Sequence, residues 1–393
     1  MKYCSRIFAC FAICLATCAA GYGQEVVDTA PPAHGNGLAA LGAQPATYIA
    51  SDADNSAVRL ASCGECGVDW GAAVGACGDA AACGDCGIGS CCGRSRCNAT
   101  RYFWGEFLYL NPRDADVAFA DPINWSSSQL VSPIQIGPVG VLDPDYNPGF
   151  RTGFALELDC WSRVGAEFTH FESGTSAASS IAAPNVLHSL VAHPATASAT
   201  ASYLAADARL DIDFDLVDVD YRCIFACGQN YAVNYLVGAR YGHLAQEFQS
   251  QFINNGVEEV DTEITFDGGG IRFGLEAERH SCRSGLMVYG KAIASFVAGE
   301  FSADYQQRAA TDAIVVDTSW KAGRVVAMTD LEVGAGWVSR NGGLRLSCGY
   351  LINGWFNTVN VDEFIGAVQT NNFVGLGDHM TFDGLVARVE GRF

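Results

Sequence analysis

From residue 101 to the end, the chain consists of short segments in which apolar and polar residues alternate. Such alternation places successive side chains on opposite faces of an extended strand. In one segment, Phe150 and Phe154 share one face, whereas Arg151 and Glu157 share the other. The pattern predicts ten strands, near residues 101–111, 149–159, 161–171, 207–221, 230–246, 262–279, 285–303, 324–339, 342–354 and 382–393.

Two faces of different polarity fit either a soluble β-sandwich or a membrane barrel. The connections favour the barrel, because they are long after the first, third, fifth, seventh and ninth predicted strands and short after the others. The polar face is rich in glycine and in charges of both signs, whereas a soluble sheet would carry more Lys, Thr and Ser there. We therefore expect an all-β fold, an antiparallel up-and-down transmembrane β-barrel of about ten (ten to twelve) strands. A soluble secreted β-protein is the alternative.

Aromatic residues gather near the ends of the predicted strands, as the interfacial girdles of a membrane barrel require. They are Tyr102, Trp104, Tyr109, Trp161, Trp337, Tyr350 and Trp355. The last predicted strand ends on Phe393, on the same face as Leu385 and Val389. A terminal aromatic residue resembles an assembly signal, so Phe393 is a candidate contact for the barrel-assembly machinery. The expected surrounding of the barrel is outer-membrane lipid.

The first residues are typical of an export signal. Lys2 and Arg6 precede the apolar stretch Ile7–Ala16, and small residues follow near Gly23. A faint lipoprotein signature at Leu15–Cys18 leaves lipidation open. The expected location is the outer membrane of a Gram-negative-type cell envelope. We divide the chain into a signal peptide (1–24), a flexible linker (25–62), a Cys/Gly-rich periplasmic tract (63–98) and an outer-membrane β-barrel (99–393).

Charge and composition exclude several classes of function. Acidic residues outnumber basic ones by 43 to 23, for a formal net charge of −20. A nucleic-acid partner is therefore not expected, because it would need a basic face that displaces counterions. The same charge argues against adsorption on anionic lipid through a polybasic patch. No run of about 18 apolar residues follows the signal, so no helix is expected to span a membrane.

The Cys/Gly-rich tract contains a repeat with an offset of 20 residues, in which the segment 61–67 recurs as 81–87. The spacing of Cys63, Cys66, Cys83 and Cys86 matches a four-thiolate zinc site. Export favours disulfides instead, because thiols oxidise outside the cytosol. Zinc, disulfides within the tract, disulfides to other envelope proteins, or neither all remain open. The candidate cysteines are Cys63, Cys66, Cys77, Cys83, Cys86, Cys91, Cys92 and Cys97.

Two further cysteines, Cys223 and Cys227, flank a predicted short turn. They are disulfide candidates if their Cα atoms approach within about 7 Å. Buried free thiols are the equal alternative.

The region from Tyr102 onward resembles the Legionella-type pore-forming outer-membrane protein family, which also includes planctomycete-like barrel proteins. The resemblance covers about three quarters of the chain and consists of glycine and aromatic motifs in a fixed order. These are Trp104–Leu110, Gly149–Gly153, Val237–Tyr241, Gly268–Glu276, Val288–Lys291, Cys348–Tyr350 and Trp355. The resemblance implies a pore in the outer membrane. It transfers no catalytic residue and no cofactor, and it does not extend to the Cys/Gly-rich tract.

Charged residues on the polar face are the candidate lumen and constriction residues, since in a pore they would set the ion preference. By alternation they are Arg151, Glu157, Arg163, Glu167, Arg240, Arg272, Glu276, Arg345, Arg388 and Glu390. Barrels of about eight strands are filled by side chains, whereas 16–18 strands leave a channel. Two functions therefore remain: a narrow pore for ions and small polar solutes, or a plugged structural or adhesive barrel that anchors outer loops and a disulfide-linked periplasmic arm.

Three local patterns have plainer explanations than chemistry. The aspartates at positions 211, 213, 215, 218 and 220 form a run without a calcium-binding loop. The first three alternate on a strand, so we assign the run to the lumen wall, with a bulge at Leu216–Val217. Gly268–Gly270 fits a kink or bulge rather than a phosphate cradle, because no helix follows. His170, His188, His193 and His379 lie near predicted outer loops without a nucleophile motif, so no enzyme is expected.

Overall fold

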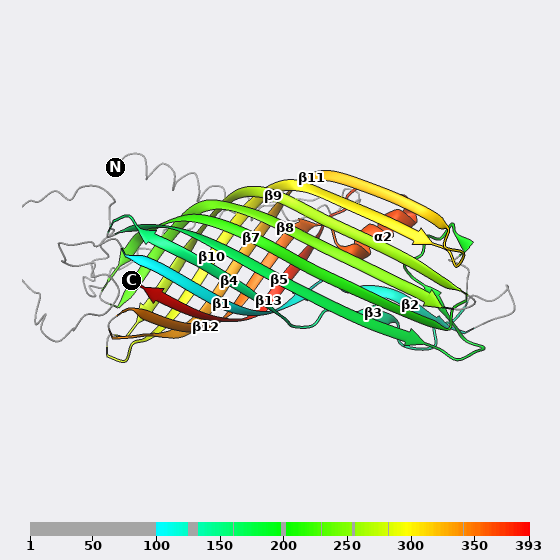
Figure 1. Cartoon of the computed structure of the whole chain (residues 1–393), viewed down its shortest axis with the longest axis horizontal. Coiled ribbons are helices and arrows are strands. Elements are labelled where there is room, and N and C mark those ends of the chain that lie inside the picture. The colour runs from blue at the N-terminus through cyan, green and yellow to red at the C-terminus, as the bar shows by residue number, and fades with distance from the viewer. Residues whose placement is uncertain are drawn as a thin grey trace, which may run out of the picture. The chain divides into compact units, whose positions relative to one another are not determined.

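Ten antiparallel strands form a closed barrel in which each strand pairs with its neighbours around the ring (Figure 1). The structure, a computed structural model, describes residues 100–393 except 125–132, 160, 198–201, 229, 254–255, 282 and 341. The barrel strands are β1 (Arg101–Arg113), β4 (Asn147–Glu157), β5 (Ser162–Ser180), β7 (Ala205–Cys227), β8 (Tyr231–Ile253), β9 (Val257–His280), β10 (Leu286–Arg308), β11 (Ile314–Val338), β12 (Leu344–Thr358) and β13 (Asp378–Arg392). The predicted fold and each of the ten predicted strands are confirmed.

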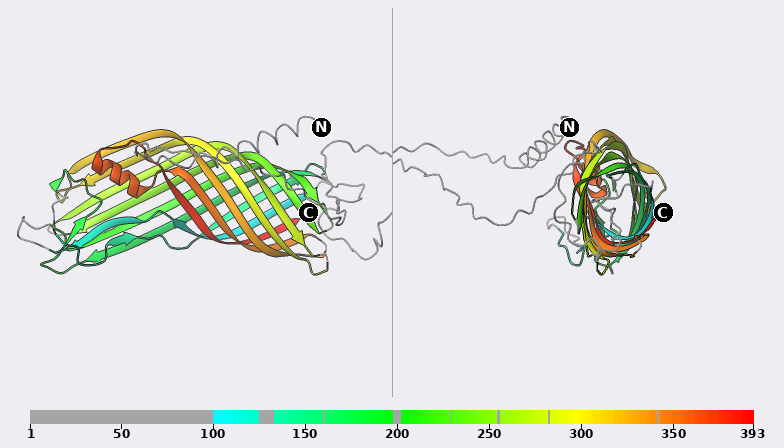
Figure 2. Two further views of the ribbon diagram at one scale, coloured as in Figure 1. Left: turned by 180° about the vertical axis from the view of Figure 1, so that it is seen from behind. Right: turned by 90° about the vertical axis from the view of Figure 1, so that its left-hand side faces the viewer.

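The ring closes between the first and last strands, β1 and β13. The N–H of Phe393 donates to the carbonyl oxygen of Arg101 (2.9 Å), the N–H of Arg101 donates back (3.0 Å), and the Phe393 ring contacts Phe103. The paired residues can be followed around the ring from Glu106 in either direction. Through β4 they lead to Arg324, and through β13 they lead to Gly336, both on β11. This stagger makes the strands tilt against the barrel axis, as Figure 2 shows.

The two faces of β7 exchange polarity halfway along the strand. From Ala206 to Arg222, even-numbered residues point inward; they are apolar up to Leu216 and charged from Asp218 to Arg222. Between Asp207 and Tyr221, odd-numbered residues point outward; they are charged up to Asp215 and apolar from Val217. Burial alternates without interruption across this point, so the predicted bulge at Leu216–Val217 is wrong. The aspartates at 211, 213 and 215 lie on the outer wall, not in the lumen.

The neighbouring strands change polarity at the same row of paired residues. The first polar row on the outer wall consists of His170, Asp215, His243, Asp267 and Glu300, which are direct cross-strand partners on β5 and β7–β10. Between this row and the end of the barrel where β1 begins and β13 ends, exposed apolar residues form a band around the barrel. Examples are Phe107, Phe154, Ile271, Leu331 and Leu385. We call this band the lipid belt, and the part of the barrel inside it the membrane half. The part on the other side of the row is the outer half.

Two of the five long loops that the sequence predicted are short turns. β8 and β9 are joined at 254–256, and β10 and β11 are joined at 309–313. These strands extend through the outer half. Their outward residues are polar there, so the sequence pattern of apolar outward residues did not indicate a strand. The connections 114–146, 181–204 and 359–377 are long, as predicted.

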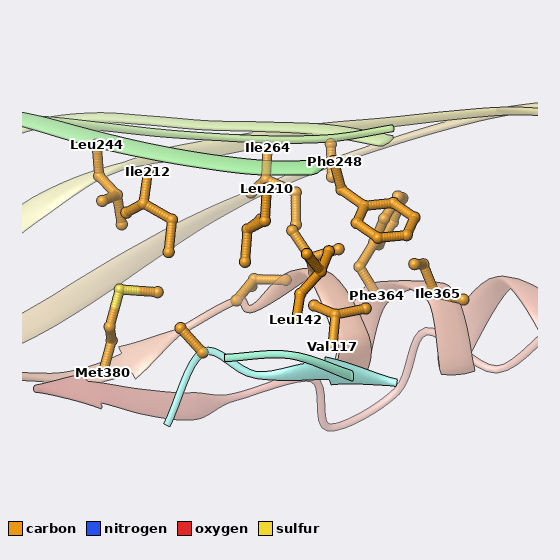
Figure 3. Packing of buried hydrophobic residues seen from close by; sticks show 14 of the residues in the cluster. Val117, Leu142, Leu210, Ile212, Leu244, Phe248, Ile264, Phe364, Ile365 and Met380 are labelled. Carbon is orange, nitrogen blue, oxygen red and sulfur yellow. The ribbon is translucent and has the colours of Figure 1, made fainter. Parts of the chain in front are cut away.

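The long connections carry inserts that the sequence did not predict. β2 (Val117–Ile123), β3 (Gly140–Leu142) and β6 (Val186–Ser189) form a small sheet, and α2 (Val361–Thr370) is a helix between β12 and β13. Figure 3 shows side chains from these inserts packed against inward residues of the outer half, where Val117, Leu142 and Phe364 approach Leu210 and Phe248. No helix among the described residues is long and apolar enough to cross a membrane.

The Gly268–Gly270 segment lies in a regular part of β9. Its pairing with β8 and β10 continues without a register shift, so the predicted kink or bulge is wrong. A Cβ at Gly270 would lie 1.8 Å from the carbonyl oxygen of Phe296. Glycine is needed here because the β10 backbone approaches too closely for a side chain.

Arginine at position 331, inside the lipid belt, should destabilise the barrel strongly. We expect Leu331→Arg to lower the free energy of unfolding from lipid vesicles by about 2–4 kcal/mol. The matched control is Ser319→Arg, on the outer wall of the same strand, where the new cation would lie opposite Asp304 and cost about 0–1 kcal/mol. Guanidinium titration of refolded protein measures both values, and equal losses would contradict the position of the belt.

Candidate functional site

The membrane half of the lumen contains a network of charged side chains. The structure places all ten predicted lumen residues on the inward side of their strands. These are Arg151, Glu157, Arg163, Glu167, Arg240, Arg272, Glu276, Arg345, Arg388 and Glu390. Nine of the ten make an ion pair within the lumen, and Glu157 accepts a hydrogen bond from the Tyr102 hydroxyl.

The part of the network nearest the outer half centres on Arg240. Its guanidinium donates to both carboxylate oxygens of Asp218, at 2.7 and 3.0 Å, and to Asp330 at 2.7 Å. Arg272 contacts the same Asp218 and lies 3.2 Å from Asp220. All of these side chains are less than a tenth exposed. Two arginines and three aspartates therefore bridge β7, β8, β9 and β11 across the lumen.

A second part of the network centres on Glu106 of β1. One carboxylate oxygen accepts from Arg151 at 2.9 Å and the other accepts from Arg388 at 3.0 Å. Arg388 also donates to Glu390 at 2.8 Å. Arg151 lies 3.7 Å from Glu332 of β11, which connects β1 and β4 to the opposite wall. Of these contacts, the one between Arg151 and Glu332 cross-braces the barrel, because β4 and β11 are not neighbours; those of Glu106 join paired strands.

Trp104 packs among these charges. Its indole N–H donates to Glu167 at 3.0 Å. The guanidinium carbons of Arg388 and Arg222 lie 4.8 and 6.0 Å from its ring centre. A cation over an aromatic face is attracted by the ring quadrupole. The indole therefore fills space between two arginines that would otherwise repel each other.

Several network residues were not among the predicted candidates. They are Glu106, Asp218, Asp220, Arg222, Glu278, Lys291, Asp330 and Glu332. Alternation within each strand was the signal that could have found them. On β7 the aspartate run was assigned to the lumen wall as a whole; Asp218 and Asp220 do point into the lumen, whereas the three aspartates before them do not.

Aromatic side chains close the lumen above the charges. The Phe382 ring lies 4.7 Å from Phe214 and 6.1 Å from Trp355, centre to centre, and all three are buried. The Trp355 indole N–H donates to Asn353, whose amide donates to Asp330. The apolar filling of the outer half thus rests directly on the ion-pair network.

Of the two alternatives for Cys223 and Cys227, the structure does not support a disulfide between them. Both residues lie on β7, not on opposite sides of a turn, and Cys227 is a free thiol. Four residues of extended strand span about 13 Å, which exceeds the reach of a disulfide. The eight cysteines of the tract 63–98, with both the zinc and the disulfide hypotheses, lie outside the described residues.

The histidines do not form one cluster. The imidazole of His170 lies 2.8 Å from Asp215 on the outer wall, whereas His188 lies on β6 and His379 on β13. Within the part of the chain that the structure describes, no three His, Cys, Asp or Glu residues are arranged to hold a metal ion.

Loss of Arg240 should be far more costly than loss of a charge near the lumen mouth. We expect Arg240→Met to lower the free energy of unfolding by about 3–5 kcal/mol, because Arg272 alone would then have to neutralise three buried aspartates. The control is Arg345→Met, whose ion pair with Glu278 is about a fifth exposed and should contribute about 1 kcal/mol or less. Denaturant titration in vesicles measures both values. An equally small loss of unfolding free energy in the two variants would contradict a tightly packed network.

Comparison with known proteins identifies relatives at the level of fold and family. A family model described as "Legionella pneumophila major outer membrane protein precursor" matches residues 97–383. No curated relative matches significantly. Among solved structures, the outer membrane protease OmpT from Escherichia coli is 10% identical, with 76% of this chain and 99% of that chain covered and a TM-score of 0.45.

Two further solved structures have lower TM-scores. The TodX deltaS2S3 mutant, a monoaromatic hydrocarbon channel, is 10% identical over 76% of this chain and 91% of its own, with a TM-score of 0.31. A Pseudomonas aeruginosa FadL homologue is 7% identical over 75% of this chain and 90% of its own, with a TM-score of 0.21. None of these three likenesses is close enough to bear on function. The family model spans most of the chain, including the barrel described above, and the protein therefore belongs to the Legionella pneumophila major outer membrane protein family.

Proposed function

We propose that the protein is a closed outer-membrane barrel that does not conduct at rest. It anchors its own outer half and a periplasmic arm in the envelope. The observation that carries the proposal is the filling of the lumen in both halves. In the membrane half, Asp218 and Arg272 are 1% and 2% exposed; in the outer half, Phe248 and Phe301 are fully buried. Two fillings of opposite polarity in series oppose the passage of both ions and apolar solutes.

The second candidate is a narrow pore for ions and small polar solutes, as family membership suggests. One observation favours it: the outer filling includes inserts carried by loops. Side chain to backbone hydrogen bonds hold α2, with the Gln369 amide donating to the carbonyl oxygens of Leu190 (2.6 Å) and Ala192 (3.1 Å). Withdrawal of α2 would open the outer half down to the aromatic side chains that cover the lumen charges, and charges of both signs are suited to polar solutes.

Planar-bilayer conductance of the refolded full-length protein separates the two functions. We expect no discrete steps from the wild type. Replacement of residues 361–370 by a Gly/Ser linker should give steps only if the protein is a pore closed by α2. The control is a variant with alanine at the exposed helix positions Asp362 and Thr370, which should conduct like the wild type. Steps from the wild type would contradict the closed anchor.

The proposal assigns the tract 63–98 to a periplasmic arm that joins neighbouring envelope proteins through disulfides. Non-reducing electrophoresis of envelopes should then show adducts of higher mass that disappear on reduction. Serine at all eight cysteines of the tract should abolish them, whereas serine at Cys227 and Cys348, which are free thiols of the barrel, should leave them unchanged. Adducts that persist without the tract cysteines would rule out this attachment.

A further inference from the structure

We propose that one rim of the barrel, where β1 begins and β13 ends, binds the head groups of anionic phospholipids. Four exposed arginines form this rim, and we call them the rim arginines: Arg101, Arg279, Arg283 and Arg340. The inference concerns the outer surface of the barrel, so it does not depend on whether the lumen is closed or open.

Strand geometry turns two of the rim arginines toward lipid. Arg101 is the outward residue next to Phe103 on β1, and both side chains are exposed. Arg279 is the outward residue after Ala277 on β9, directly opposite Tyr231 of β8 and Val288 of β10. Each guanidinium therefore lies one step beyond the lipid belt, at the depth where phospholipid head groups begin.

The other two rim arginines lie in turns that connect this arc. Arg283 is in the turn 281–285 and Arg340 is in the turn 339–343. The N–H of Val338 donates to the carbonyl oxygen of Gly285, which joins the two turns at 2.9 Å. The N–H of Arg392 donates to Gly343, also at 2.9 Å, and β13 pairs with β1 at Arg101. The four arginines thus follow one another around the rim from β9 to β1.

Their charge is available to a ligand. None of the rim arginines has an ion-pair partner among the described residues. The exposed carboxylates at this end of the described chain are the α-carboxylate of Phe393, next to Arg101, and Asp159, in the turn between β4 and β5. Asp159 accepts hydrogen bonds from the N–H groups of Trp161 (2.8 Å) and Ser162 (2.7 Å), so it caps its own turn. The rim is therefore locally positive in a chain of strongly negative net charge.

The opposite margin of the lipid belt has the opposite charge. Its first polar row contains Asp215, Asp267 and Glu300, and further acidic residues follow on the outer wall. An anion is thus repelled at one margin and attracted at the other. Directly beside the rim arginines lie exposed apolar side chains, including Leu156, Leu286 and Val288. A ligand that satisfies both features has an apolar tail and a negative head, and an anionic phospholipid has both.

Lipid selectivity measured by electron spin resonance tests this binding. The full-length protein is refolded into phosphatidylcholine vesicles with spin-labelled phosphatidylglycerol or spin-labelled phosphatidylcholine at low salt. We expect motionally restricted phosphatidylglycerol to be favoured about five-fold, the factor that one arginine near a membrane surface contributes. Replacing the four rim arginines with glutamine should bring the ratio close to one. In 0.5 M salt the wild-type ratio should also fall, because exposed charges are screened.

The matched control replaces Arg209, Arg308 and Lys321, cations of the outer half, with glutamine; it should keep the wild-type ratio. Heat modifiability on electrophoresis checks that every variant is folded. A wild-type ratio of one, or a ratio that the rim substitutions leave unchanged, would overturn the proposal. An equal loss in the control variant would also overturn it, because the attraction would then not reside in the rim.

Discussion

Each long strand of this barrel must satisfy lipid on one half of its outward face and water on the other, and the rest of the structure depends on this constraint. Where the outside is apolar, the alternate side chains that point inward are polar, as Asp218 and Arg240 are. Where the outside is polar, the inward side chains are apolar, as Phe214 and Phe248 are. One unbroken alternation therefore produces two interiors of opposite character, stacked along one axis.

The two interiors are filled in different ways. Charges enclosed by a ten-stranded wall lose hydration, so each needs an oppositely charged partner; Arg240 with Asp218 and Asp330 meets this requirement. In the apolar interior, loop-borne inserts pack against the wall residues, with Phe364 packed against Trp320. The resulting closed lumen is a consequence of both fillings, and it is what favours an anchor over an open pore.

Much of the fold could be predicted from alternation alone, including all ten strands and the inward side of Arg151 and Arg272. The errors arose where alternation continues but its polarity reverses. At Leu216–Val217 that reversal resembled a bulge. In the outer half, the parts of β8 to β11 that adjoin the turns 254–256 and 309–313 resembled loops. The helix α2 has apolar residues at Val361, Phe364, Ile365 and Val368, a helical spacing that could have been found. The partners of each ion pair could not, because they depend on the stagger of the closed ring.

Nitroxide scanning along β7 in vesicles tests the polarity exchange most directly. A label is placed at each position from 207 to 221, and its collisions with dissolved oxygen and with a water-soluble paramagnetic reagent are measured. The account predicts that outward positions up to Asp215 meet the water-soluble reagent, that those from Val217 to Tyr221 meet oxygen, and that every inward position meets neither. Free access of the water-soluble reagent to inward positions, from Leu210 through Asp220, would contradict a filled lumen.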